Sequence, residues 1–188
     1  MNITDNKIFD GKYFSTDLFP KGEYEKCAFR NSDFTGTDLS NVIFIDCIFE
    51  NCNLSMAGVR NTSFRGVRFV NCKLLGLNFS ECNPFLMSLR YENCLMNLTS
   101  FYKLKLKGIR FRNCNLQEAD FTETDLTLSI FDGCDLERAI FEHTLLEKAD
   151  FRSSYHYSID PTVNRIKKAK FSRDGLAGLL DKYDIVIE

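Results

Sequence analysis

Large apolar residues recur at every fifth position along most of this chain, and a small residue usually stands two places before each of them. A helix would show apolar residues every three or four positions, and a half-buried strand would show them every two, so neither period explains the pattern. A small and a large inward residue followed by a corner make one side of a coil. Four such sides predict coils of about 20 residues that stack into an all-β solenoid.

Residues 20 apart should then lie above one another, and the spacing becomes 22 across a frame shift after Phe79. Neighbouring coils are expected to pair as parallel strands, with a rise of roughly 4.8 Å per coil. One column is predicted to form an aromatic ladder through the interior, and its members are Phe9, Phe29, Phe49, Phe69, Tyr91, Phe111, Phe131, Phe151 and Phe171. A second predicted column holds Leu86, Leu106, Leu126, Leu146 and Ile166.

All eight cysteines occupy the small position of the repeat. Three interpretations compete for them: a zinc site, disulfides, and small buried wall residues. A straight ladder of parallel side chains does not supply tetrahedral ligands for zinc, and parallel Cβ vectors in a reducing cytosol oppose disulfides. The third interpretation is favoured, because Ala, Ser and Thr occupy the same position. It predicts one column of structural cysteines, namely Cys52, Cys72, Cys94, Cys114 and Cys134, with Cys27 and Cys47 paired on a neighbouring face.

Two polar features mark corners of the coils. Asparagines recur in one column at 31, 51, 71, 93 and 113, where their tolerance of left-handed backbone suits turns. The frame shift falls on Ser80–Phe85, and Pro84 lacks an N–H, so a two-residue bulge is expected near 80–85.

The motif of a small residue, Asp or Asn, a large apolar residue and two variable positions resembles that of the pentapeptide-repeat proteins. Ala119-Asp120-Phe121-Thr122-Glu123 and Ala149-Asp150-Phe151-Arg152-Ser153 match it. The resemblance implies a right-handed quadrilateral β-helix of about eight coils. We assign residues 1–171 to this body, with an irregular stretch at 153–163, and residues 172–188 to a C-terminal helix and short strand.

The tail changes period. Ser172 is expected to cap a helix whose apolar residues follow the spacing i, i+3, i+4, i+7, and Ile185–Ile187 is expected to form a short strand. The helix would cover the open end of the β-helix. A similar tail closes the Qnr-type quinolone-resistance members of the family, and that resemblance implies a homodimer through the C-terminus. The predicted cap and interface residues are Leu176, Leu179, Leu180, Tyr183, Ile185 and Ile187.

Charge and the N-terminal sequence bear on class and location. The formal charge of −2 divides into −4 for residues 1–151 and +2 for 152–188, so no global attraction to nucleic acid or membrane is expected. The basic run at 165–173 is interpreted as a solvated face. The N-terminus lacks the pattern of a signal peptide, and no apolar stretch is long enough to span a membrane, so a cytoplasmic protein is expected.

Catalytic chemistry has little support in the sequence. His143 is predicted on an outward position and His156 in a loop, and neither has an evident nucleophile and carboxylate around it. No phosphate-binding loop occurs. A core packed with Phe and Leu is expected to leave no space for a cofactor. The sequence therefore predicts a non-enzymatic protein without a catalytic, cofactor or metal site.

Two functions remain open. The resemblance to Qnr-type proteins implies a mimic of duplex DNA that binds a type II topoisomerase, either DNA gyrase or topoisomerase IV, and protects it from quinolones. This chain lacks the long loops of several Qnr members. The alternative is a general protein-interaction scaffold unrelated to topoisomerases, because a rigid prism offers flat binding faces.

Overall fold

The computed structural model describes residues 2–14 and 18–186. Its strands are short, as expected when each side of a coil holds only five residues. They are β1 (Ile3–Asp5), β2 (Ile8–Asp10), β3 (Glu23–Glu25), β4 (Ala28–Arg30), β5 (Ile43–Ile45), β6 (Ile48–Glu50), β7 (Ser63–Arg65), β8 (Val67–Val70), β9 (Leu89–Glu92), β10 (Arg110–Arg112) and β11 (Ile130–Asp132). The 3₁₀ helices are η1 (Phe79–Glu81), η2 (Asp174–Leu179) and η3 (Asp181–Tyr183).

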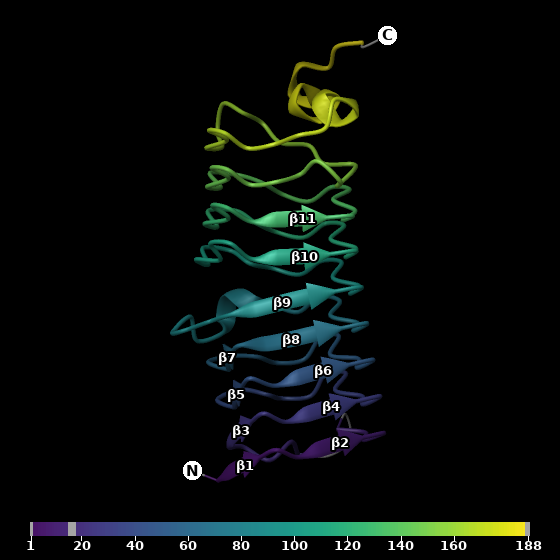
Figure 1. Cartoon of the computed structure of the whole chain (residues 1–188), viewed down its shortest axis with the longest axis vertical. Helices are drawn as coiled ribbons and strands as arrows, with labels where there is room; N and C mark the ends of the chain where they lie inside the picture. Colours follow the sequence, from purple (N-terminus) through teal and green to yellow (C-terminus); the bar gives the residue numbers. More distant parts are fainter. Residues whose placement is uncertain (1, 15–17, 187–188) are drawn as a thin grey trace.

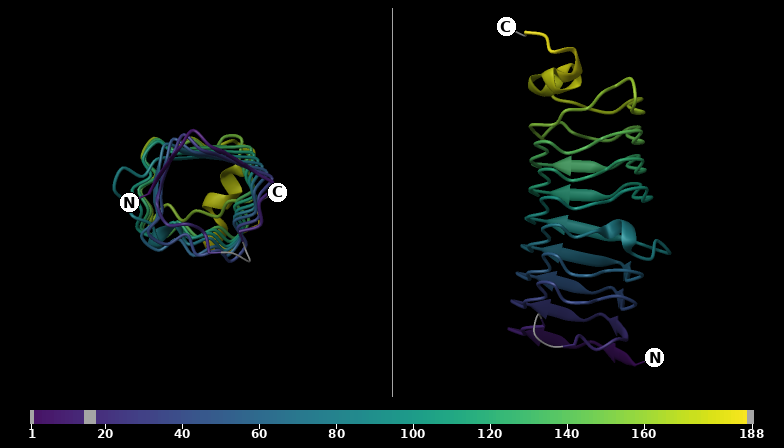
Figure 2. Two further views of the ribbon diagram at one scale, coloured as in Figure 1. Left: turned by 90° about the horizontal axis from the view of Figure 1, so that it is seen from below. Right: turned by 180° about the vertical axis from the view of Figure 1, so that it is seen from behind.

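The chain forms a right-handed quadrilateral β-helix, which confirms the predicted solenoid (Figure 1). Every strand pair is parallel, and the register advances by one coil, as in Phe29 opposite Phe49. Within the described residues, one face carries the sheet β1-β3-β5-β7 and the next carries β11-β10-β9-β8-β6-β4-β2. The other two faces are joined by isolated parallel bridges such as Asp33 to Asn53. Viewed along the long axis, the coils superimpose into a hollow ribbon outline that the inward side chains fill (Figure 2).

The interior contains a continuous aromatic column. Nine rings stack in sequence, with centroids 4.7–5.5 Å apart and interplanar angles of 4–18°. They belong to Phe9, Phe29, Phe49, Phe69, Tyr91, Phe111, Phe131, Phe151 and Phe171. A second stack formed by Phe79, Phe101, Phe121 and Phe141 meets the first edge to face, which is the geometry that aromatic quadrupoles prefer.

The frame shift takes the form of a loop that leaves the wall of the β-helix (Figure 2). Before the loop, Asn83 pairs with Ser63, which lies 20 residues earlier in the chain. After the loop, Leu89 pairs with Val67, which lies 22 residues earlier. The prediction that Leu86 belongs to an inward column is wrong, because its side chain is 64% exposed. The two extra residues fall between Asn83 and Ser88, so the chain turns outward at Leu86 and Leu89 is the next buried residue.

The C-terminal tail lies across the last coil, over the central opening (Figure 2). Ser172 Oγ accepts a hydrogen bond from the Gly175 amide at 3.0 Å, and Leu179 packs against the core. The Ile159 amide donates to the Gly178 carbonyl at 2.8 Å. A Cβ at Gly178 would collide with the carbonyl oxygen of Tyr157, so the close approach of tail and wall requires glycine there.

The helical part of the tail is of the 3₁₀ type and is split at Leu180, instead of being one amphipathic helix. Asp184 has a φ of +49° and ends the second turn. The predicted strand at 185–187 is absent at Ile185 and Val186, the two of its positions that the structure describes. Ile187 lies outside the described residues. The tail therefore forms two short 3₁₀ helices in place of the single longer helix that the spacing of its apolar residues predicted.

Candidate functional site

The cysteines line the wall of the β-helix as buried free thiols. Cys52, Cys72, Cys94 and Cys134 each donate a weak hydrogen bond to the carbonyl of the large residue in the coil below, with Sγ–O distances of 3.3–3.5 Å. Thr62, Thr124 and Thr144 make the same contact through Oγ1 at 2.8–2.9 Å. A small side chain with a donor therefore fits this position, which explains why both Cys and Thr occur there.

Burial makes two of these thiols, Cys47 and Cys82, poor nucleophiles. Desolvation raises the pKa of Cys47 to about 12, and it raises the pKa of Cys82 as well. Because the thiolate is the reactive form, neither group is suited to catalysis or to metal binding at neutral pH.

The asparagine corner is a hydrogen-bonded ladder. Asn31, Asn51, Asn71, Asn93 and Asn113 all have φ between +47° and +54°. The side-chain amide of each of the last four donates to the amide oxygen of the asparagine below, at 3.1–3.3 Å. These side chains satisfy one another's hydrogen-bonding groups along one edge of the rod.

His156 has a carboxylate partner that the sequence prediction missed. Its Nδ1 lies 3.0 Å from Asp135 Oδ1, and Glu137 lies close enough to join them in one group of possible metal ligands. Burial alone would raise the pKa of Asp135, but hydrogen bonds from Gln117 and His156 lower it overall. Asp135 and His156 are 21 residues apart, so counting one coil upward would have found the contact. His143 is exposed on an outward corner, with a φ of +52°.

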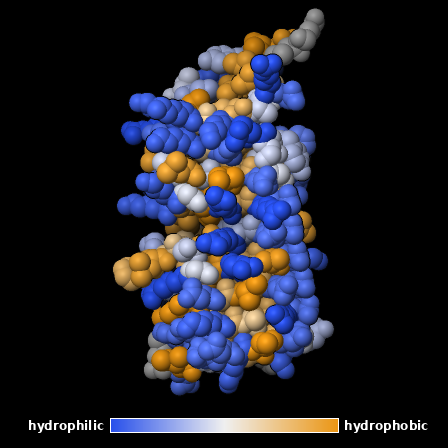
Figure 3. Space-filling view, viewed as in Figure 1, coloured by the Kyte–Doolittle hydropathy of each residue, from blue (hydrophilic) through white to orange (hydrophobic). Residues whose placement is uncertain are grey.

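The tail presents apolar side chains to solvent. Leu176, Leu180, Tyr183 and Ile185 are 37–55% exposed, whereas Leu179 is turned inward. Figure 3 shows hydrophobic atoms at this end of the molecule. Lys182 holds η3 on the body, since its Nζ lies 2.8 Å from Asp160 Oδ1. The predicted interface residues that the structure describes therefore form one exposed group at the C-terminal end, except for Leu179.

Charge is arranged in bands along the rod. Residues 60–112, called here the basic band, contain ten Lys or Arg and two Asp or Glu, a net charge of +8. Residues 113–150, the acidic band, contain two Lys or Arg and ten Asp or Glu, a net charge of −8. Because the chain climbs one coil every 20 residues, these segments become adjacent levels of the rod. The overall charge of −2 conceals both bands.

Within the described residues, no helix has the length and hydropathy needed to cross a membrane.

The basic run at 165–173 is exposed except for its small and apolar members, and Lys170 lies 3.8 Å from Asp150. These exposed cations agree with the solvated face that the sequence predicted.

Sequence comparison identifies the repeats directly. A model described as "Pentapeptide repeat region" matches residues 42–121, and one described as "Pentapeptide repeats (8 copies)" matches residues 25–57, 105–142 and 129–155. A search of curated proteins found no match.

Solved structures share the fold at low sequence identity. A trypsin-treated variant of QnrB1, a plasmid-mediated fluoroquinolone resistance protein, is 21% identical, with full coverage of both chains and a TM-score of 0.59. HetL is a pentapeptide repeat protein involved in heterocyst differentiation regulation from the cyanobacterium Nostoc sp. strain PCC 7120. It is 15% identical, the match covers 90% of this chain and 86% of HetL, and the TM-score is 0.52. The repeat matches, the quadrilateral coils and these likenesses show that this chain belongs to the pentapeptide-repeat family.

Proposed function

We propose that this protein is a non-enzymatic binding rod and that its partner is a type II topoisomerase, either DNA gyrase or topoisomerase IV. The observation that carries the proposal is the fold shared with the fluoroquinolone resistance protein QnrB1 over the whole of both chains. The core supports a binding role, because stacked rings and buried aliphatic side chains occupy its centre. Recognition then depends on the outward residues.

The acidic band is the proposed contact surface. Its net charge of −8 lies on about two coils, which is roughly 10 Å of rod at about 4.8 Å per coil. Duplex DNA carries one charge per roughly 1.7 Å, or about six over the same length. The acidic band therefore matches the charge density of DNA over a short distance. The coils of the basic band, which precede it along the rod, carry the opposite charge and do not resemble DNA.

The proposed active form is a homodimer joined through the C-terminal tail. Leu176, Leu180, Tyr183 and Ile185 expose apolar area at the end of the rod, and burial of such area is the main driving force for association. A two-fold axis there would bring two acidic bands to either side of the junction. Light scattering is expected to give a dimer at micromolar concentration, and Leu176→Asp with Tyr183→Asp is expected to give a monomer. A wild-type monomer would contradict the dimer.

A gyrase supercoiling assay with a quinolone tests the partner. The wild-type protein is expected to inhibit supercoiling or to protect the enzyme at micromolar concentration, and Glu137→Gln with Glu142→Gln should weaken the effect. Asp5→Asn with Asp10→Asn is the matched control, since it removes the same charge from exposed positions outside the band. No effect of the wild-type protein at tens of micromolar would refute the topoisomerase proposal.

The second candidate function is a scaffold for partners unrelated to topoisomerases. The charge bands favour this scaffold function, because DNA is negatively charged along its whole length and the basic band carries a net charge of +8. A negative supercoiling assay together with direct binding of a different purified protein would support this function.

A further inference from the structure

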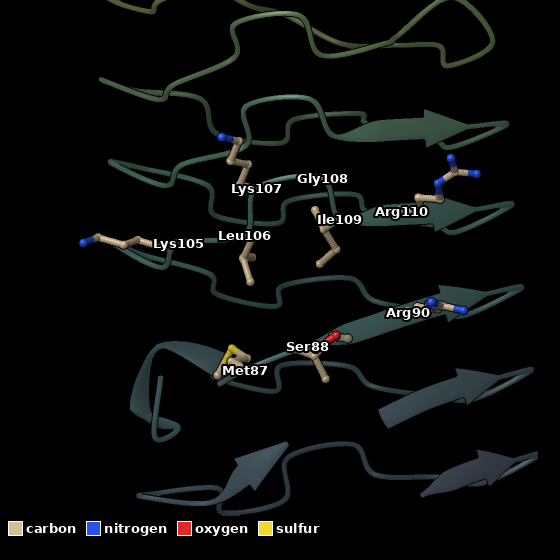
Figure 4. Close-up of a pocket in the computed structure, with 10 residues that line it drawn as sticks. Met87, Ser88, Arg90, Lys105, Leu106, Lys107, Gly108, Ile109 and Arg110 are labelled. Carbon is tan, nitrogen blue, oxygen red and sulfur yellow. The ribbon is translucent and has the colours of Figure 1, made fainter. Parts of the chain in front are cut away.

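The inserted loop opens the wall of the β-helix between two coils. A groove of about 530 Å³ lies between residues 87–90 and 105–110 (Figure 4). Met87, Leu106 and Ile109 contribute to its floor, and Leu106 is 5% exposed where Leu126 in the next coil is fully buried. The groove exists because the chain turns outward at Pro84–Met87 and does not cover the coil above.

The coil above the loop lacks hydrogen bonds that other coils make. The Asp125 amide donates to the Leu104 carbonyl in the coil below at 2.9 Å, and the Asp125 and Thr127 carbonyls accept from Leu106 and Gly108 at 2.8 Å. One coil lower, Lys105 and Lys107 occupy the equivalent positions. Among the described residues, no backbone group from the coil below pairs with the Lys105 amide or with the carbonyls of Lys105 and Lys107. One donor and two acceptors therefore face the groove edge unpaired.

Four cationic side chains surround this edge. Lys105 and Lys107 project on one side of the groove, and Arg90 and Arg110 lie on the adjacent strands β9 and β10 at the other (Figure 4). All four are exposed, none forms an ion pair within the described part of the chain, and no carboxylate lines the groove.

The arginines are also in register with one another. Arg68, Arg90 and Arg110 stand directly opposite on three consecutive strands. Like charges directly opposite on neighbouring strands repel, so this row is maintained at a cost to stability. An anion in the groove would relieve the repulsion.

We propose that this groove binds an extended acidic segment of a partner protein, which adds a short strand to the open edge of Lys105–Lys107. The backbone of such a segment supplies the missing donors and acceptor, as in β-strand addition, and its carboxylates meet the four cations. A nucleic acid fits less well, because it offers no matching ladder of N–H and C=O groups and would meet the adjacent acidic band. The proposal does not depend on a topoisomerase partner.

Fluorescence anisotropy with a labelled peptide of alternating Glu and Val tests the site on the full-length protein. Saturable binding is expected, and it should weaken as salt screens the charges. Arg90→Glu with Lys107→Glu should lower the affinity by about tenfold or more, because charge reversal places like charges beside the peptide. The matched control is Arg138→Glu with Lys148→Glu, which makes the same charge change at exposed positions of the acidic band and should leave affinity within about twofold.

Two further measurements separate strand addition from simple ion pairing. A peptide of equal charge with alternate amides N-methylated should bind about tenfold more weakly, and the Lys105 amide should exchange hydrogen more slowly in the complex. No saturable binding, an equal loss in both double variants, or unchanged binding of the N-methylated peptide would overturn the proposal. Tighter binding of a single-stranded oligonucleotide of equal charge would overturn it in favour of nucleic acid. Circular dichroism of each variant establishes that the fold is intact. If the charge-reversed protein is unfolded, binding is measured with Arg90→Gln and Lys107→Gln in its place.

Discussion

The centre of the aromatic column should carry much more of the stability than its end. Phe111 is fully buried, and its ring stacks on Tyr91 at 5.3 Å and on Phe131 at 5.1 Å. It also meets Phe101 and Phe121 edge to face at 5.8 and 6.0 Å. Replacing it with alanine removes all four ring contacts and leaves a cavity inside a wall that hydrogen bonds hold in place.

The expected cost of Phe111→Ala is about 3–5 kcal/mol of unfolding free energy, the usual range for a buried phenylalanine. Phe9→Ala is the matched control, because Phe9 belongs to the same column but is only partly buried. Its ring stacks on one side only, on Phe29 at 4.9 Å, and meets Phe14 and Tyr24 edge to face. Its burial is incomplete, so a cost of about 1–2 kcal/mol is expected.

Urea denaturation followed by circular dichroism measures both variants. The slope with denaturant should be compared as well, because a rod whose coils contact only their neighbours is able to unfold in parts. A loss for Phe111→Ala no larger than that for Phe9→Ala would refute the view that the column is the continuous core of the protein.

Three smaller predictions follow from other features. Native protein should react with a thiol reagent at all eight cysteines only slowly, since every one of them is buried and out of reach of the reagent, and rapid modification of any cysteine before unfolding would contradict this. Asn71→Ala should cost about 1–2 kcal/mol in urea titration, because Asn71 has a φ of +53°, whereas Asn71→Gly should cost less and isolate the loss of the amide ladder. Hydrogen bonds from Ser40 and Lys21 lower the pKa of Asp38 to about 2, so its ionised form stabilises the fold above the unfolded pKa near 3.8, and this contribution is lost as the pH falls toward 2. The stability difference between wild type and Asp38→Asn should therefore shrink between about pH 5 and pH 2, and a constant difference would exclude that role.

The five-residue period was sufficient to predict the fold because nearly every fifth residue is a large apolar side chain that is buried only if it points into the coil. The rows of Phe29, Phe49 and Phe69 follow from counting alone. Counting fails at the frame shift, where the same apolar letters fit two registers. At that point the chain turns outward, so that Leu86 is exposed and Leu89 is the next residue buried in the wall.

Outward residues were harder to interpret, because the repeat places no constraint on them. The contact of His156 with Asp135 and the row of Arg68, Arg90 and Arg110 both become visible only when the chain is written coil by coil. The charge bands do not appear when the net charge is divided at residue 151, because both bands lie on the N-terminal side of that division and cancel. The tail was predicted as a helix from spacing alone, and the contact of Gly178 with Tyr157 that shapes it has no signature in a periodic pattern.

The loop at Pro84–Met87 shows how this architecture accepts added sequence. Two residues leave the wall at one corner, and Tyr91 nevertheless stacks on Phe69 at 5.5 Å, so the coils above return in phase. An insertion that begins and ends at the same corner therefore leaves the aromatic column in phase. This corner is a natural attachment point for a foreign peptide or a longer binding loop, which the rod would display at a fixed height without changing the position of anything above it.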